Sequence, residues 1–517
     1  MRPKASIIWF KRDLRLSDHA PLQAAIERGL PLIPLYVIEP DYWRLATSSR
    51  RHWHFIHDSL CELQARFHQL GQPFYIRTGT VTDILTELRQ RVQIDAIYAH
   101  EETGNLWTYN RDEQVRDYLY AHQIPLHELP SAGVARRFFN RDKWAAMRNQ
   151  RISSPRLTPP QSLPSPLPQM TLPAGTLPAK DAPLFGPPIT ADDMTQAGGR
   201  TKAISLLTSF LEHRSDNYVR HLASPSKAEF SCLRLSPHLS YGTISSREVT
   251  QTIQNYLAHP DNHITAVQKR SCRAVLSRLA WRCHFMQKLE DAPEIEKSAM
   301  HPLYEDIRQD SHNEAYLQAW QDGKTGYPLI DACMRCLQKT GWLPFRMRAM
   351  LVSFASYHLW LDWRITAPHL ARLFTDYEPG IHYSQFQMQS GITGINTIRI
   401  YNPIKQTDDH DKQGTFIRKW CPELANLPAP YLSEPHKIPP FEALSIGFQI
   451  GRDYPLPIVE NEQAMRQARD KIFAIRKQDG FARLAARVYQ KMGSRNSPDR
   501  RKKQKPKKPE TDQYSLF

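Results

Sequence analysis

The first 135 residues alternate short apolar runs with longer amphipathic stretches, and this alternation limits the fold more than any other feature of the sequence. The apolar runs are 6–10, 30–38, 73–79, 94–100 and 124–130. Short strands separated by helices assemble into parallel sheets with crossover helices. Residues 1–135 are therefore predicted to form a doubly wound α/β domain. Because no G-x-G-x-x-G follows the first run, we expect no dinucleotide site of that type there.

The remainder of the chain carries helical patterns without strand signals. Residues 155–188 hold eleven prolines in thirty-four positions, which favours extended chain over helix. From Thr201 to about residue 376, apolar side chains recur at helical spacing. The predicted parts after residue 135 are a proline-rich linker at 136–200, an α-helical domain at 201–492 with a terminal helix over 464–492, and a disordered basic tail at 493–517.

The charge and the cysteines suggest the partner and the compartment. Lys and Arg number 68 against 52 Asp and Glu, a formal net charge of +16. This excess favours a polyanion such as DNA, and the alternative is a solvated basic surface with one basic tail. Seven scattered cysteines are typical of reduced thiols in a cytosol. Without a secretory leader or an apolar run of about 20 residues, we expect a cytoplasmic monomer that does not bind membranes.

The stretch 341–406 combines a buried helix pattern with charges that need partners. Arg346 and Arg348 sit among apolar residues, and an arginine in such a helix is costly unless a carboxylate or a ligand meets it. Asp376 and Glu378 follow in the next loop and could supply that partner. The polar, glycine-bearing sequence after them suits the wall of a pocket better than a core.

The same stretch resembles the flavin-binding helical domain of the DNA photolyase/cryptochrome family. The matching motifs are GKTGYPLIDACMRCLQKTGW at 323–342, RMR at 346–348, DWR at 362–364, RIYNP at 399–403 and WFKRDLRLSDHAPL at 9–22. The resemblance covers nearly all of 1–480. It implies an all-α FAD-binding domain behind the α/β domain, with a possible antenna chromophore of unspecified identity in the α/β domain.

The resemblance implies a set of flavin-binding residues. They are Tyr218, Cys232, Leu233, Arg234, Leu235, Ser236, Arg348, Asp376, Tyr377, Glu378 and His382. Arg234 and Ser236 would contact the phosphates, and Arg348 with Asp376 would form the ion pair beside the ring. His382 would face ring N5, where a hydrogen-bonding side chain tunes the redox state, and Tyr383 is one residue away. The alternative for Arg348 and Asp376 is an ion pair that merely fills a core.

The residues expected to carry electrons depart from the family pattern. Repair enzymes of this family deliver electrons through three tryptophans, of which Trp363 alone matches. Phe386 and Asp310 occupy the other two places, and phenylalanine is far harder to oxidise than tryptophan. Trp360, Trp342, Trp320 or a tyrosine could provide another route, although most such aromatics pack a core. The predicted catalytic residues are His382, Trp363 and Trp281.

The predicted DNA-contacting residues also differ from the usual set. They are Arg278, Trp281, Arg282, Phe345, Arg346, Met388, Arg399 and Gln406. Trp281 would stack on a flipped base and Arg282 would hold phosphate. Arg278 replaces the acid with which pyrimidine-dimer photolyases contact the lesion, so the substrate is open between a cyclobutane dimer, a (6-4) photoproduct and none.

Three smaller patterns were weighed. Cys333 and Cys336 with Cys232 and Cys421 could hold an iron–sulfur cluster, but buried thiols are the favoured interpretation, and no metal ligand is assigned. His52, His54 and His57 are predicted to lie on the surface. The last five residues resemble the bacterial sliding-clamp-binding pentapeptide, in which Gln513 would meet a polar rim and Leu516 and Phe517 an apolar cleft. The alternative is an inert tail.

Three functions follow from these patterns. The favoured one is a light-driven, FAD-dependent lyase that transfers an electron to a flipped pyrimidine lesion, of the deoxyribodipyrimidine photolyase type. The second is a cryptochrome-type blue-light photoreceptor without repair activity. The third is a basic DNA-binding protein without flavin, which the absorption spectrum of purified protein distinguishes from the other two.

Overall fold

The computed structural model describes residues 2–131, 133–138, 140–168, 171–189, 193–260 and 263–494. The predictions for the tail, including those for Gln513, Leu516 and Phe517, fall outside these residues.

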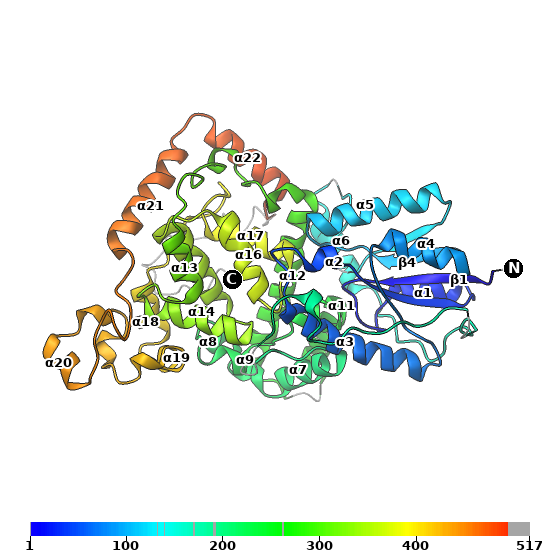
Figure 1. Ribbon diagram of the computed structural model, residues 1–517, viewed down its shortest axis with the longest axis horizontal. Coiled ribbons are helices and arrows are strands. Elements are labelled where there is room, and N and C mark those ends of the chain that lie inside the picture. Colours follow the sequence, from blue (N-terminus) through cyan, green and yellow to red (C-terminus); the bar gives the residue numbers. More distant parts are fainter. Residues whose placement is uncertain are drawn as a thin grey trace.

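The amino-terminal part is built around a parallel sheet with the strand order β3-β2-β1-β4-β5 (Figure 1). Its elements are β1 (Lys4–Phe10), α1 (Ala20–Glu27), β2 (Leu32–Ile38), α2 (Pro40–Trp43), α3 (Arg50–Gln69), β3 (Tyr75–Thr78), α4 (Val81–Arg91), β4 (Gln93–His100), α5 (Leu106–Ala121) and β5 (Leu126–Leu129). Each predicted strand is found near its expected position, so the doubly wound α/β prediction is confirmed.

Side chains of β1 alternate between two cores, one on each face of the sheet. Ile8 and Phe10 pack with α1 and α3, whereas Ile7 and Trp9 pack with α4 and α5. Burial on both faces explains why these strands read as continuous apolar runs.

The order of the strands reverses at β1, because β2 and β3 lie on one side of it and β4 and β5 on the other. In open α/β sheets, ligands bind at the carboxyl ends of the strands where the order reverses. The segments after β1 and β4 are therefore the places in this domain where a ligand is expected.

The proline-rich segment is extended, as predicted, but it is packed rather than loose. It follows α6 (Trp144–Ser153) and runs along the α/β domain. The amide of Ile76 donates to the carbonyl of Ala174 at 2.9 Å, and the ring of Phe185 stacks on Trp53 with centroids 3.9 Å apart.

The carboxy-terminal part is helical, and its described residues contain no strand beyond a single bridge between Ile450 and Tyr454. Its helices are α7 (Arg200–Glu212), α8 (Tyr218–His221), α9 (Ala228–Ser231), α10 (Ser236–Ser240), α11 (Ser246–Ala258), α12 (Ala266–Asp291), α13 (Glu314–Asp322), α14 (Pro328–Thr340), α15 (Phe345–Ser353), α16 (Trp363–Leu373), α17 (Pro379–Gln389), α18 (Pro403–His410), α19 (Thr415–Trp420), α20 (Pro440–Ser445), α21 (Asn461–Arg476) and α22 (Phe481–Met492). None of the described helices has the length and apolar character needed to cross a bilayer.

The predicted single terminal helix over 464–492 is wrong in one respect. The segment forms α21 and α22, which meet at an angle in Figure 1. Gly480 has φ 80°, a left-handed conformation that an α-helix cannot contain, and it therefore ends one helix before the next begins.

Candidate functional site

A cavity of about 340 Å³ lies within the helical part, between α10, α12, α15 and α17. Its size falls within the range of ordinary small-molecule sites. The predicted site residues on its wall are Tyr218, Cys232, Leu233, Leu235, Ser236, Arg278, Trp281, Arg282, Phe345, Arg348, Asp376, Tyr377, Glu378 and His382. The fold therefore brings together segments that are up to 160 residues apart in the sequence.

The ion pair predicted between α15 and the loop before α17 is present. Arg348 Nη1 lies 2.8 Å from Asp376 Oδ1, and Nη2 lies 2.9 Å from Oδ2. The side chain of Asp376 is 4% exposed. Burial alone would raise the pKa of Asp376, but the guanidinium and a hydrogen bond from Ser236 outweigh it and hold the pKa below its usual value.

Glu378 has one paired and one orphaned carboxylate oxygen. Oε2 lies 2.8 Å from Arg282 Nη2 and 3.5 Å from Arg12 Nη2. Oε1 is buried and has no hydrogen-bond partner. An orphaned carboxylate oxygen on the wall of a cavity is costly unless a ligand supplies a donor, such as a ring N–H or a ribityl hydroxyl.

The partners of Glu378 correct one expectation and reveal a residue that sequence reasoning missed. Arg282 was expected to hold DNA phosphate, but its guanidinium points inward to Glu378, the carbonyl of Leu239 and the sulfur of Met286. Arg12 reaches across from the α/β domain and donates to the carbonyls of Ser240 and Tyr377, each at 2.9 Å. Arg12 lies within the amino-terminal motif, so its charge was visible, but its destination was not.

His382 lies on the cavity wall in a fixed tautomer. Its Nε2 is 3.0 Å from the carbonyl oxygen of Ala367, which can only accept, so Nε2 carries the proton. Burial lowers the pKa of His382 to about 4, so the ring is neutral and Nδ1 keeps its lone pair. The ring packs against Phe386 with centroids 4.7 Å apart. His382 can therefore offer a hydrogen-bond acceptor to a ligand.

One face of α17 supplies more of the wall than was predicted. Gln385 and Gln389 line the cavity together with His382 and Phe386. Residues separated by three, four and seven positions share a helix face, so this spacing could have identified both glutamines.

Trp281 marks the place where the cavity reaches the surface. It lines the cavity and is 37% exposed, which is high for a tryptophan. Its ring stacks near Phe285 at a centroid distance of 5.7 Å. Arg278 lies one helical turn earlier on α12, on the same wall, and hydrogen-bonds Tyr218. The opening thus presents an aromatic face beside a cation.

Several predicted residues do not line the cavity. Arg234 has φ 61° and its guanidinium lies 4.1 Å from the ring centroid of Trp342, with a hydrogen bond to Gln196, so its side chain is directed to these neighbours. The others outside the lining are Trp363, Arg346, Met388, Arg399 and Gln406. Trp363 is buried, with its ring 6.3 Å from that of Tyr383, and Arg346 lies over the ring of Tyr401.

Two minor predictions are corrected. His52 is buried rather than on the surface, with Nε2 3.0 Å from the carbonyl oxygen of Phe374. The cysteines considered for an iron–sulfur cluster do not converge among the described residues: Cys232 lines the cavity, whereas Cys333, Cys336 and Cys421 pack in the core of the helical part.

Comparison with known protein families agrees with this geometry. Residues 6–136 match the family model described as DNA photolyase, and residues 275–474 match the model described as the FAD binding domain of DNA photolyase. The chain belongs to the DNA photolyase/cryptochrome family. The cavity lined by Arg348, Asp376 and Glu378 lies largely within the matched FAD-binding segment.

Photolyases and cryptochromes are both similar to this chain. A deoxyribodipyrimidine photo-lyase of Alkalihalophilus pseudofirmus is 29% identical over 89% of this chain and 96% of its own length. A cryptochrome DASH of Synechocystis is 27% identical over 91% of this chain and 98% of its own length. The crystal structure of a class III photolyase from Agrobacterium tumefaciens has the same fold, with a TM-score of 0.80 at 24% identity, over 92% of this chain and 99% of that one.

Proposed function

We propose that this protein is a light-driven DNA-repair lyase that binds FAD in the helical cavity and acts on a pyrimidine lesion. One observation carries the proposal: a cavity of about 340 Å³ has an orphaned carboxylate oxygen and a bidentate ion pair inside and a 37% exposed tryptophan at its opening. The interior suits a polar, planar cofactor, and the opening suits a base that leaves the DNA helix.

The residues present fit FAD. Glu378 Oε1 lacks a donor, His382 Nδ1 offers an acceptor, and Ser236 lies beside Asp376 near the start of α10. FAD, when bound, supplies light-driven transfer of one electron. The chain would fix the orientation of the ring through Arg348 and Asp376, and the closely packed wall would exclude water.

The opening would bind the lesion. Trp281 would stack on the flipped base, and base–aromatic stacking contributes about 1–3 kcal/mol. Arg278 would place a guanidinium where a carboxylate is usual, which favours a lesion or flanking group that presents acceptors. The formal net charge of +16 favours approach to DNA.

A second function, a blue-light photoreceptor, is supported by specific substitutions. Phe386 lines the cavity where a tryptophan would deliver electrons, and Arg278 replaces the usual acid. Illumination of the FAD-loaded, reduced protein with DNA that carries one defined lesion separates the two functions. Restoration of either a cyclobutane dimer or a (6-4) photoproduct supports the lyase, and no restoration of either supports the photoreceptor.

A flavin-sized antenna does not fit the crevice at the carboxyl ends of β1, β2 and β4. That space is about 50 Å³, and Arg111 occupies it between the rings of Trp9 and Trp107, at 4.8 and 5.8 Å. Glu39, Glu102 and Asp112 pair with the same guanidinium. We infer that the crevice holds a buried ion network in place of an antenna of that size.

The carboxy-terminal pentapeptide supports a further partner, the bacterial sliding clamp. Gln513, Leu516 and Phe517 carry the pattern, after a basic stretch suited to a flexible tether. Deletion of 513–517 should abolish binding to purified clamp. Unchanged affinity after this deletion would show that the tail is inert in clamp binding.

A further inference from the structure

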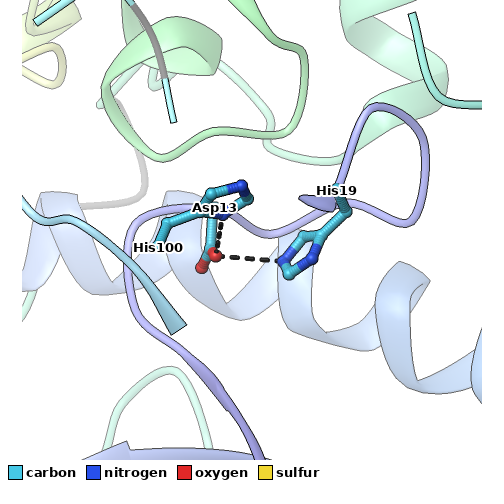
Figure 2. A group of neighbouring side chains, drawn as sticks. All are labelled: Asp13, His19 and His100. Carbon is cyan, nitrogen blue, oxygen red and sulfur yellow. Dashed lines mark hydrogen bonds and ion pairs between the residues drawn. The ribbon is translucent and has the colours of Figure 1, made fainter. Parts of the chain in front are cut away.

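Asp13, His19 and His100 form a buried cluster beside the point where the strand order reverses (Figure 2). Asp13 follows β1, His100 ends β4, and His19 is the N-cap of α1. Asp13 Oδ2 lies 2.6 Å from His100 Nδ1 and 3.0 Å from His19 Nε2, while Oδ1 accepts from the amide of Lys11 at 2.8 Å. One carboxylate oxygen thus joins two imidazoles.

The hydrogen bonds argue against a metal ion at this cluster. His19 Nδ1 accepts from the amide of Leu22 at 3.1 Å, so the neutral ring carries its proton on Nε2 and has no lone pair there for a metal. Asp13 and His100 remain, which is fewer protein ligands than metal sites normally use. The cluster is therefore a hydrogen-bonded proton carrier rather than a metal centre.

The same bonds fix the protonation of His100. Its Nδ1–H donates to Asp13, which leaves the lone pair on Nε2. Burial opposes ionisation of Asp13, but the two imidazoles outweigh it and hold the pKa of Asp13 well below its usual value. Burial lowers the pKa of His100 to about 3, so the ring stays neutral. His100 Nε2 is thus an acceptor that needs a donor.

His100 lines a second cavity, of about 60 Å³, between the two domains. A few water molecules fit such a space. Leu239, Ser240, Arg282 and Glu378 line both this cavity and the larger one. Glu378, with its orphaned Oε1, therefore stands between the space that contains His100 and the proposed FAD site.

The other charged groups around the small cavity are already paired. Arg15 donates to the carbonyls of Asp18 and Gly242, and Lys11 lies 3.3 Å from Asp112. The remaining pairs are Arg12 and Arg282 with Glu378 Oε2, Glu102 with Arg111, and Glu101 with Arg151 at 3.9 Å. Among the described groups on this wall, His100 Nε2 and Glu378 Oε1 are left to hold water.

We propose that the interdomain cavity is a water-filled proton passage to the FAD site, with His100 as a positioning residue and Glu378 as the proton donor. A water that donates one hydrogen to His100 Nε2 points its other hydrogen at Glu378 Oε1. This rests on the proposed function, because FAD is the recipient of the proton.

The proton and electron balance is simple. Two electrons come from a soluble thiol, which becomes a disulfide and releases two protons to solvent. The flavin ring takes one proton when it takes those electrons. Glu378 Oε1–H gives up that proton, and water in the cavity replaces it from solvent. His100 and Asp13 change neither charge nor bonding.

The experiment measures proton uptake rather than repair. A pH-indicator dye follows proton uptake while the FAD-loaded protein is reduced under light with thiol present. We expect His100→Phe to slow proton uptake about tenfold or more by disordering the water. Glu378→Gln should slow it about 100-fold by removing the donor. Imidazole added to His100→Gly should restore the rate.

His19→Asn is the matched control. An asparagine keeps an acceptor for the amide of Leu22 and preserves the N-cap, and His19 does not line the cavity. Its proton-uptake rate should equal that of the wild type. A nitrogen-15 NMR spectrum of the apoprotein should show His100 protonated on Nδ1 and not on Nε2.

Three outcomes decide between the proposals. If the wild type binds no FAD, the proposed function and the passage both fail. If FAD binds with unchanged affinity to His100→Phe and proton uptake is as fast as in the wild type, the passage alone is overturned. If His100→Phe does not fold, the NMR tautomer and the Glu378→Gln rate decide, and an Nε2 proton or an unchanged rate overturns the passage.

Discussion

Arg348 and Asp376 meet in parallel, with both Nη–Oδ contacts between 2.8 and 2.9 Å and the carboxylate almost fully buried. Removal of one member of such a pair leaves the other without compensation, which costs about 3–5 kcal/mol. The pair thus contributes to folding while it presents a fixed edge to the cavity.

Arg348→Ala should therefore lower the free energy of unfolding by about 3–5 kcal/mol and abolish retention of FAD. Urea unfolding and the absorbance of bound flavin measure the two effects. The control is Arg28→Ala, because Arg28 also pairs twice with a carboxylate, Asp95, but is 52% exposed. Its loss should stay below about 1 kcal/mol. Equal losses for the two variants would contradict the interpretation of Arg348.

Stability should fall in mild acid because buried histidines are held neutral. Burial lowers the pKa of His52 and of His382 to about 4, below the ordinary value of 6.5. Between pH 6.5 and 4 the unfolded chain binds these protons and the folded chain does not, so stability decreases as the pH falls through this window. Each such group contributes up to about 1.4 kcal/mol per pH unit.

Urea unfolding from pH 7.5 to 5.0 measures this dependence. His382→Gln should reduce the slope, because glutamine does not titrate. His213→Gln is the control, since the side chain of His213 is 80% exposed. An unchanged slope in His382→Gln would show that His382 titrates normally in the fold.

Trp281→Ala should weaken the binding of lesion-bearing DNA by about 1–3 kcal/mol, or roughly 5- to 150-fold, and leave bound FAD unchanged. Fluorescence anisotropy with damaged and undamaged duplexes measures this effect. Tyr120→Ala, which truncates an aromatic ring that is 87% exposed on α5, should change neither affinity. Equal losses for damaged and undamaged DNA would mean that Trp281 does not stack on a flipped base.

Purified protein should carry one flavin per chain and no second chromophore of similar size. The reason is the occupation of the crevice by Arg111 and its three carboxylate partners. Chromatography of an acid extract, scaled to protein concentration, counts the chromophores. Arg111→Ala should unfold more easily, because three buried carboxylates would lose their cation. A second flavin or deazaflavin in the extract would contradict this prediction.

The backbone pattern was more predictable than side-chain orientation. The alternation of apolar runs located the strands, because burial on both faces leaves a local signature. The Arg348–Asp376 pair was also predictable, since a charge within an apolar helix demands a partner. The directions of Arg234 and Arg282 were not predictable in this way. They depend on Trp342 and Glu378, which are distant in sequence and whose positions no local pattern encodes.

The reach of Arg12 into the helical domain means that the two halves of the chain are not independent units. It holds the carbonyls of Ser240 and Tyr377 and adds a second cation to Glu378. A fragment that begins at Thr201 would expose those acceptors and slacken the loop that carries Asp376. Evolution could therefore not exchange the sheet for another module without also rebuilding the floor of the light-absorbing chamber.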